Sequence, residues 1–264
     1  MKLGVIGCGN MATAILKGLI KNNPFEKLIL NIFDIDKNKT NNLKKYKYIN
    51  ICQTTDILLK SSDYILIAVK PQHFDSLFNS INIDDNTVII SIAAGKTIDN
   101  IQSYYKTQKK IVRIMPNTPA LVNLCMSGIS FKNNISELEK KNVLKIFNVL
   151  GKTLIVEENR IDAITAVSGS GPAYLFYFAE AFIESAMNLG FSKDESILLV
   201  NQTIKGSVEL MLNSEDEPDI LRKKVTSPGG TTEAAINNLE KENFKNILIK
   251  SIEKAKQRSI ELKS

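Results

Sequence analysis

The chain has 264 residues, of which 44% are hydrophobic and 23% are charged, and it carries a formal net charge of +6 at pH 7. This length allows one large core or two modest ones, and the composition is that of a folded soluble protein, which excludes disordered and collagen-like classes. The basic residues are scattered among Asn, Ile and Glu, as in 37–47 and 241–263. Such scattering is typical of a solvated surface, so we expect no nucleic-acid partner.

The three cysteines, Cys8, Cys52 and Cys125, share no metal-ligand spacing. Their odd number fits a reducing compartment, and we expect them to pack among apolar neighbours and to bind no metal. No apolar run approaches the roughly 18 residues that a membrane span requires. A strand expected from residue 3 leaves no room for a cleaved targeting peptide. These observations predict a cytoplasmic protein with no membrane partner.

Short apolar runs alternate with helical patterns through the first part of the chain. The predicted strands are 3–7, 28–33, 49–52, 65–69, 88–92 and 111–115, and the predicted helices between them are 11–21, 37–46, 72–80 and 97–105. Continuous apolar strands that alternate with helices predict a parallel sheet covered on both faces. A strand at 128–131, a helix near 137–149 and a strand at 153–156 are expected to extend this sheet.

After about residue 158 the strand signals stop. The segments 174–189, 195–211 and 244–262 have apolar positions at three- and four-residue spacing, which predicts long amphipathic helices. This part has few helices and therefore a limited core of its own, yet the helices carry many apolar positions. We therefore expect this all-helical part to pair with a second copy of the chain.

A glycine-rich loop joins the first predicted strand to the first predicted helix. Gly7, Gly9 and Ala12 give it the G-x-G-x-x-A form of the dinucleotide fingerprint. The first glycine permits the tight turn, the second lets the backbone approach a pyrophosphate, and the helix start offers free N–H groups to the anion. An ordinary glycine-rich turn is the alternative. The cofactor contacts expected here are Ile6, Gly7, Cys8, Gly9, Asn10 and Met11.

The second predicted strand ends at Asp34, about twenty residues beyond the fingerprint, where an acid usually accepts hydrogen bonds from the adenosine ribose and repels a 2′-phosphate. Lys37 and Lys39 lie just beyond and could bind that phosphate instead. Asp34 could also cap the following helix. The cofactor is therefore predicted to be NADH or NADPH, with the balance toward NADH.

Two further strand ends are expected along the ligand crevice of such a sheet. Small residues there admit a cofactor, and Lys70 would face either the nicotinamide, a substrate anion or solvent. The residues at these ends are Ala68, Val69, Lys70 and Pro71 after the fourth strand and Ala93 and Ala94 after the fifth.

Three segments carry residue types that packing alone does not require. Segment 113–119 ends a strand with two prolines, segment 168–174 is a Ser- and Gly-rich turn before a long helix, and segment 225–232 places glycines and hydroxyls at a helix start. Exposed N–H groups and hydroxyls at a helix start form a cradle for a carboxylate. The alternative for each segment is a capped helix start.

Together these segments resemble the pyrroline-5-carboxylate reductase family over essentially the whole chain, in the order 7–12, 68–71, 115–119, 168–174 and 227–232. The Pro-Gly-Gly-x-Thr core of 225–234 is the most specific signature. The resemblance implies a Rossmann-type domain over 1–158 and a helical domain over 159–264 that interlocks with a second subunit, with a higher oligomer left open. It also implies NAD(P)H-dependent reduction of 1-pyrroline-5-carboxylate to L-proline in proline biosynthesis.

The resemblance also implies roles for individual residues. Thr232 would hydrogen-bond the ring nitrogen, and Glu215 matches an acidic family position, although 214–219 is also typical of an acidic surface turn. Some family members have Asn in place of Thr55, near the adenosine phosphate end of the cofactor, which leaves the cofactor choice open. Pro116 is assigned to the cofactor. The substrate contacts implied are Ser170, Ser227, Gly229, Gly230, Thr231 and Thr232, with Lys70, Glu215, Ser227 and Thr232 as the candidates for catalysis.

Two rival functions fit the sequence less well. A reductase of 3-hydroxy acids typically uses a lysine in the long interdomain helix, and segment 174–189 contains none. A cofactor-sensing protein without activity would show a broken substrate cradle, whereas Gly229, Gly230 and Thr232 are all present. A six-membered cyclic imine as substrate stays open.

Overall fold

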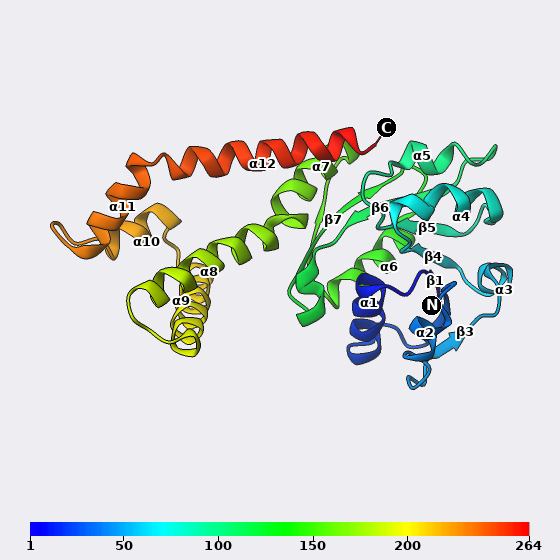
Figure 1. Ribbon diagram of the computed structural model, residues 1–264. Coiled ribbons are helices and arrows are strands. Elements are labelled where there is room, and N and C mark those ends of the chain that lie inside the picture. Colours follow the sequence, from blue (N-terminus) through cyan, green and yellow to red (C-terminus); the bar gives the residue numbers. More distant parts are fainter. Residues whose placement is uncertain (264) are drawn as a thin grey trace. The chain divides into compact units, whose positions relative to one another are not determined.

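The computed structural model of the protein describes residues 1–263. Its strands are β1 (Lys2–Ile6), β2 (Ile29–Phe33), β3 (Ile49–Ile51), β4 (Tyr64–Ile67), β5 (Val88–Ser91), β6 (Lys110–Met115), β7 (Cys125–Phe131) and β8 (Gly151–Ile155). They form one eight-stranded sheet in the order β3-β2-β1-β4-β5-β6-β7-β8 (Figure 1). The predicted Rossmann-type sheet is confirmed, including its extension beyond the sixth strand.

The strand order reverses between β1 and β4. From β1 the chain moves outward to β2 and β3, and it then crosses back to place β4 on the other side of β1. In parallel sheets the connections on the two sides of such a reversal leave in opposite directions and open a crevice at the carboxyl ends of the strands. The topology therefore places a ligand site after β1, β2 and β4.

Short helices connect the strands. They are α1 (Asn10–Lys21), α2 (Lys37–Asn41), α3 (Thr55–Lys60), α4 (Phe74–Ser80), α5 (Ile98–Gln102) and α6 (Glu137–Asn148), with the 3₁₀ turns η1 (Pro71–His73) and η2 (Thr118–Val122). Helix α1 buries Ala12, Ile15, Leu16 and Leu19, whose spacing of three and four residues forms one apolar face.

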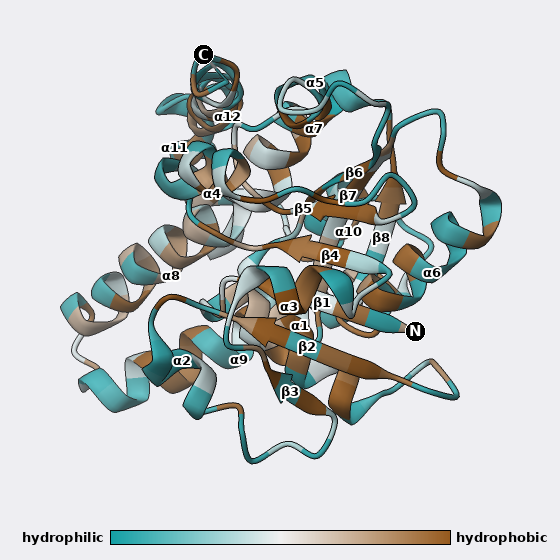
Figure 2. Cartoon of the chain, turned by 90° about the vertical axis from the view of Figure 1, so that its right-hand side faces the viewer, coloured by the Kyte–Doolittle hydropathy of each residue, from teal (hydrophilic) through white to brown (hydrophobic). Residues whose placement is uncertain are grey.

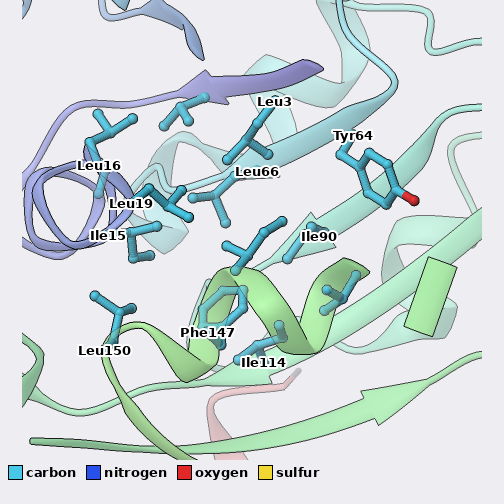
Figure 3. Close-up of a cluster of buried hydrophobic side chains, with 14 of the residues drawn as sticks. Leu3, Ile15, Leu16, Leu19, Tyr64, Leu66, Ile90, Ile114, Phe147 and Leu150 are labelled. Carbon is cyan, nitrogen blue, oxygen red and sulfur yellow. The ribbon is translucent and has the colours of Figure 1, made fainter. Parts of the chain in front are cut away.

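The core beneath α1 and α6 joins both helices to the sheet. Leu3, Leu66 and Ile90 from the strands meet Ile15 of α1 and Phe147 of α6 (Figure 3), and all five are fully buried or nearly so. The central strands carry almost continuous hydrophobic sequence (Figure 2). This pattern is expected for strands that are covered on both faces.

Strand β7 runs antiparallel to β6, whereas every other neighbouring pair is parallel. The connection from Met115 to Cys125 contains only the short turn η2. A parallel return needs a crossover of a dozen or more residues, so this connection turns the chain back directly. The sheet is thus parallel-dominated rather than wholly parallel.

Two predicted details in the region between β2 and β4 were wrong. The helix expected over 37–46 ends at Asn41, and the chain continues in turns. Leu43 is buried within these turns, so its apolar position imitated the spacing of a longer helix. Helix α3, which the sequence pattern did not indicate, is only six residues long and begins where the Thr54 hydroxyl accepts the Ile57 N–H at 3.3 Å. Both helices are too short for apolar periodicity to define.

Beyond β8 the chain is helical, as predicted. The elements are η3 (Glu158–Arg160), α7 (Ile161–Ile164), the π-helical turn η4 (Thr165–Gly169), α8 (Gly171–Asn188), α9 (Lys193–Asn213), α10 (Pro218–Lys224), α11 (Thr231–Lys241) and α12 (Phe244–Glu261).

By its internal contacts the chain forms two compact units. Unit 1 comprises Met1–Ser170 and the residues from Ala255 onward, and unit 2 comprises Gly171–Lys254. The predicted domain boundary between residues 158 and 159 stays a prediction. None of the helices among residues 1–263 is long and apolar enough to cross a membrane.

Candidate active site

A cavity of about 500 Å³ lies at the carboxyl ends of β1, β2 and β4, where the strand order reverses. It contains eight of the residues predicted to bind the cofactor, namely Ile6, Gly7, Gly9, Asp34, Thr55, Ala68, Val69 and Lys70. Lys39, the alternative ligand for a 2′-phosphate, also lines the cavity. The remaining wall residues, which the sequence did not single out for the site, are Phe33, Ile35, His73, Ser76, Leu77 and Ser80. The crevice expected from topology and the fingerprint loop therefore coincide.

Gly7 and Gly9 have different geometric requirements. Gly7 has φ +93°, and a Cβ there would lie 2.7 Å from the Ala68 carbonyl oxygen, so no other residue fits. A Cβ on Gly9 would meet no atom within 4 Å, which leaves open space on the cavity side of the loop. The fingerprint loop thus fits a pyrophosphate at Gly9, next to the start of α1.

Asp34 is held in place by the fingerprint loop itself. Its Oδ2 accepts the Cys8 N–H at 2.7 Å, its Oδ1 accepts the Asp36 N–H at 2.8 Å, and its side chain is 7% exposed. The Lys39 ammonium lies 3.7 Å from Oδ1. Asp36, rather than Asp34, caps α2 by accepting the Asn38 N–H, so the alternative role of Asp34 as a helix cap is excluded.

Cys8 lies in the fingerprint loop but does not line the cavity. Its thiol is buried, and this burial, followed by the nearby Asp34 carboxylate, raises the pKa of Cys8 to about 12. A thiol with this pKa is protonated near neutrality and is a poor nucleophile. The three cysteines are free and buried, which agrees with the packing role expected for them.

The other residues predicted at the cofactor lie outside the lining described for this cavity. They are Cys8, Asn10, Met11, Pro71, Ala93, Ala94 and Pro116. Ala93 and Ala94 follow β5, and Pro116 follows β6, so they lie at the carboxyl ends of the next strands of the same sheet. Their contact with a cofactor stays a prediction.

Asn117 ties the loop after β6 to the turn before α8, and the sequence did not indicate this role. Its Nδ2 donates to the Ser168 carbonyl at 3.1 Å and to the Ser168 hydroxyl at 3.3 Å, and its Oδ1 accepts the Met126 N–H at 2.9 Å. The side chain therefore joins the loop that contains Pro116 to Ser168, two residues before Ser170. Position in the Met-Pro-Asn-Thr-Pro motif was the available signal.

The signature 227–232 forms the turn into α11 in unit 2. Gly229 has φ +73°, and its N–H donates to Glu233 Oε2 at 2.8 Å. The Gly230 N–H donates to the Ser227 carbonyl at 3.0 Å. A substrate carboxylate could reach these two N–H groups only by displacing those partners. Glu233, which the sequence did not indicate, shows that a carboxylate oxygen fits against this turn.

Two N–H groups at the start of α11 stay open to a ligand. Those of Thr231 and Thr232 have no acceptor among residues 1–263, as is usual in the first turn of a helix. The Thr232 side chain is half-buried, and its hydroxyl has no hydrogen-bond partner in the described part of the chain. Gly230 is the N-cap residue of α11, so the Thr232 hydroxyl is not used for capping.

Glu215 and Lys70 are exposed in the single chain. Glu215 precedes the ion pair of Asp216 with Lys224 in the turn before α10, and Lys70 lines the cofactor cavity after β4. Unit 1 brings eight of the predicted cofactor residues together around the cavity, and unit 2 contains the predicted substrate cradle 227–232. Their meeting around one substrate is a proposal.

Residues 2–95 match the family described as NADP oxidoreductase, coenzyme F420-dependent, and this match covers β1 to β5 and the cavity. Fold, fingerprint and cavity together define an NAD(P)-dependent oxidoreductase. Residues 158–262 match the family described as pyrroline-5-carboxylate reductase dimerisation.

Full-length relatives give the family. The chain is 33% identical to pyrroline-5-carboxylate reductase 2 of Bacillus subtilis, with 99% of this chain and 95% of the relative covered. It is also 33% identical to pyrroline-5-carboxylate reductase of Escherichia coli, with 99% and 98% covered. The chain belongs to the pyrroline-5-carboxylate reductase family.

Solved structures agree over the whole chain. The crystal structure of Plasmodium falciparum pyrroline carboxylate reductase with NADP bound matches with a TM-score of 0.88 and 33% identity, covering 100% of this chain and 98% of that one. The enzyme from Streptococcus pyogenes matches with a TM-score of 0.90 and 27% identity, covering 99% and 98%.

Proposed function

We propose that this protein reduces 1-pyrroline-5-carboxylate to L-proline with a hydride from NAD(P)H. The observation that carries the proposal is the turn before α11, where the Gly229 N–H already binds a carboxylate oxygen, that of Glu233, at 2.8 Å. The adjacent N–H groups of Thr231 and Thr232 lie in the first turn of α11, where the positive end of the helix dipole also favours an anion. A small carboxylated substrate matches this turn.

The cofactor is assigned to the cavity of unit 1. Gly9 gives a pyrophosphate the space that a Cβ would fill, and the first turn of α1 supplies N–H donors. Asp34 would accept from the adenosine ribose through lone pairs that its two backbone donors leave free, and Thr55 and Ile35 line the same cavity. The remaining predicted contacts would bind the nicotinamide half of the cofactor at the ends of the next strands, and they include Ala93, Ala94 and Pro116.

The substrate is assigned to the signature of unit 2. The N–H groups of Thr231 and Thr232 and the Ser227 hydroxyl would bind the carboxylate, and the Gly229 N–H would join them when Glu233 turns away. The Thr232 hydroxyl would hydrogen-bond the ring nitrogen, and Ser170, two residues beyond the Ser168 that Asn117 binds, would lie beside the ring. Gly230 sets the turn geometry.

The reaction moves a hydride and a proton. When bound, a reduced nicotinamide would supply a hydride to the imine carbon. The electron pair of the C=N π bond would stay on the nitrogen, which would end with an N–H bond whose proton comes from solvent, because the free imine is partly protonated near neutrality. The chain therefore needs no strong acid. Holding the two reacting carbons together is the main contribution that its residues make.

The test compares two substrates in the oxidation of NADH and NADPH. With 1-pyrroline-5-carboxylate we expect turnover, and with 1-pyrroline, which lacks the carboxylate, we expect kcat/KM to be at least about tenfold lower, because a hydrogen bond to a charged group is worth about 1.5–3 kcal/mol. Equal kcat/KM values for the two imines would contradict the assigned cradle.

NADH is proposed as the preferred cofactor. The Asp34 carboxylate is fixed at the cavity wall and would repel a 2′-phosphate, and Lys39, at 3.7 Å, offsets this repulsion only in part. We expect a higher kcat/KM with NADH than with NADPH. Lys39→Ala should lower kcat/KM for NADPH more than for NADH, while Lys44→Ala, on the exposed turn beyond α2, should change neither. A wild-type preference for NADPH that Lys39→Ala removes would contradict the proposal.

A homodimer through the C-terminal helices is proposed as the assembly. Helices α8 and α9 bury only Ala186, Ser196 and Val200 among their residues, and they expose large apolar side chains. Those of α8 are Leu175, Phe176, Tyr177, Phe178, Phe182 and Met187, and those of α9 are Leu198, Leu199, Val208, Leu210, Met211 and Leu212. Exposed apolar surface on this scale marks an interface. A higher oligomer and a cytoplasmic location, which the three reduced cysteines favour, stay expectations.

A further inference from the structure

A cluster of charges that the proposed chemistry does not use lies in unit 1, beside the end of β6. Arg113 is 2% exposed, and its Nη1 lies 3.1 Å from Glu158 Oε1 in η3. Its Nη2 lies 3.9 Å from Oδ1 of Asp162 in α7, which is also 2% exposed. Charges as buried as these are retained only when they are paired and hydrogen-bonded.

The C-terminal turn completes this cluster. The Ser259 hydroxyl donates to Asp162 Oδ1 at 3.0 Å, and the Lys263 ammonium pairs with Asp162 Oδ2. Ser259 is buried, and the Lys263 side chain is 26% exposed. Two cations, Arg113 and Lys263, therefore face two carboxylates, Glu158 and Asp162. Through Ser259 and Lys263 the C-terminal turn is bound to Asp162 of α7, which is far from it in the sequence.

The same turn presses on the segment that follows β5. Gly95 has φ +76°, and a Cβ on it would lie 2.6 Å from the Leu262 carbonyl oxygen. Glu158 Oε1 also accepts the Ile98 N–H at 2.7 Å. Residue 95 therefore lies against Leu262 of the C-terminal turn, and residue 98 is hydrogen-bonded to Glu158 of the buried cluster. This segment begins with Ala93 and Ala94, at the carboxyl edge of the sheet where dinucleotides bind.

We propose that residues 259–263, fastened by Asp162, are a positioning element that fixes the segment 93–98 and with it the nicotinamide end of the cofactor cleft. Asp162 and Lys263 are positioning residues, since they act through Leu262 and Gly95 and not on the reacting atoms. This inference rests on the proposed function for its kinetic consequence. Its structural part, the restraint of 93–98 by the C-terminal turn, holds for the protein without cofactor.

The experiment uses two variants. The first is the full chain with Lys263→Ala, in which Asp162 keeps Arg113 at 3.9 Å and the Ser259 hydroxyl, and the second is a chain that ends at Glu261. The matched control is Lys256→Ala, an exposed lysine on the same helix α12, and Lys263→Arg should restore the wild-type values. In the cofactor-free protein we expect faster amide hydrogen exchange across 93–98 in both loosened variants. The fingerprint loop 7–12 should exchange as in the wild type.

Kinetics and binding separate positioning from general stability. We expect kcat to fall by about tenfold in the chain ending at Glu261, because small misplacements of reacting groups are costly in rate. Affinity for ADP-ribose, which lacks the nicotinamide, should stay unchanged. Unaltered exchange across 93–98 would overturn the proposal, and so would a parallel loss of ADP-ribose affinity and melting temperature. A wild-type protein without reductase activity would overturn the proposed function. The exchange measurement needs no substrate, so it would still test whether the C-terminal turn restrains 93–98.

Discussion

Gly7 and Gly9 stand two positions apart in one loop, yet each is glycine for its own reason. Gly7 has a positive φ and lies against the Ala68 carbonyl, so the fold itself requires it. Gly9 has an extended conformation and open space beyond its Cα, so nothing in the described residues 1–263 requires glycine there. Only a ligand in the cavity explains the second glycine.

This difference predicts opposite results for two alanine variants. Gly7→Ala should lower the free energy of unfolding of the cofactor-free protein by at least about 1–2 kcal/mol, because a left-handed backbone and a backbone contact both oppose the new Cβ. Gly9→Ala should leave that free energy unchanged and weaken NADH binding by about tenfold or more, which corresponds to about 1.4 kcal/mol. Chemical denaturation and a fluorescence titration measure the two effects. Normal NADH affinity in Gly9→Ala would place the pyrophosphate elsewhere.

Thr232 offers a second test at the residue scale. Thr232→Ala should lower kcat/KM by about ten- to a hundredfold, since one well-placed hydrogen bond is typically worth about 1–3 kcal/mol. Thr232→Ser keeps the hydroxyl and should retain much more activity, and cofactor affinity should change little in either variant. Because Gly230 is the N-cap residue of α11, the melting temperature should hardly change. A stable variant with full turnover would show that Thr232 does not contact the ring nitrogen.

Among the elements, the sequence predicted best where a pattern repeats. The apolar strands β1, β4 and β5 and the long helices α8 and α9 follow from hydrophobic spacing alone. The short helices α2 and α3 do not, because five or six residues contain too few periods. The antiparallel direction of β7 depends on the short connection between β6 and β7, and the hydrophobic pattern of the strand itself does not reveal that direction.

Contacts between distant residues account for what the sequence could not provide at the candidate site. The fingerprint, the strand ends and the family resemblance together named eight of the residues that line the cavity, but the hydrogen bond from the Cys8 N–H to Asp34 depends on the pairing of β1 with β2. The bond from Gly229 to Glu233 and the ties of Asn117 likewise depend on side-chain directions that exist only in the folded chain.

The exposed apolar faces of α8 and α9 predict how the assembly responds to charge. Phe176→Glu, at a side chain that is 65% exposed, should shift the protein from dimer to monomer, because a carboxylate would be buried unpaired in the interface. Leu138→Glu on α6, at a leucine that is 69% exposed, is the matched control and should leave the dimer intact. Sedimentation equilibrium across a concentration series measures both. A Phe176→Glu protein that stays dimeric would show that these helices do not form the interface.

At the scale of the whole molecule, the two units divide the work that the proposed reaction requires. Unit 1 supplies a rigid sheet edge for a dinucleotide, and unit 2 supplies a helix start that fits a carboxylate. Either part alone is common among proteins of unrelated function. Their combination in one chain of the pyrroline-5-carboxylate reductase family is what makes reduction of a carboxylated imine the central claim.

Isotope transfer tests this claim most directly. The purified protein would be given 1-pyrroline-5-carboxylate and NADH that carries deuterium on the transferable face of nicotinamide C4, and the product would be examined by mass spectrometry and NMR. We expect L-proline with one deuterium, located on the ring carbon that was the imine carbon, and none at the carbon that bears the carboxylate. Proline without deuterium, or no proline while a different carboxylated imine or carbonyl compound is reduced, would contradict it.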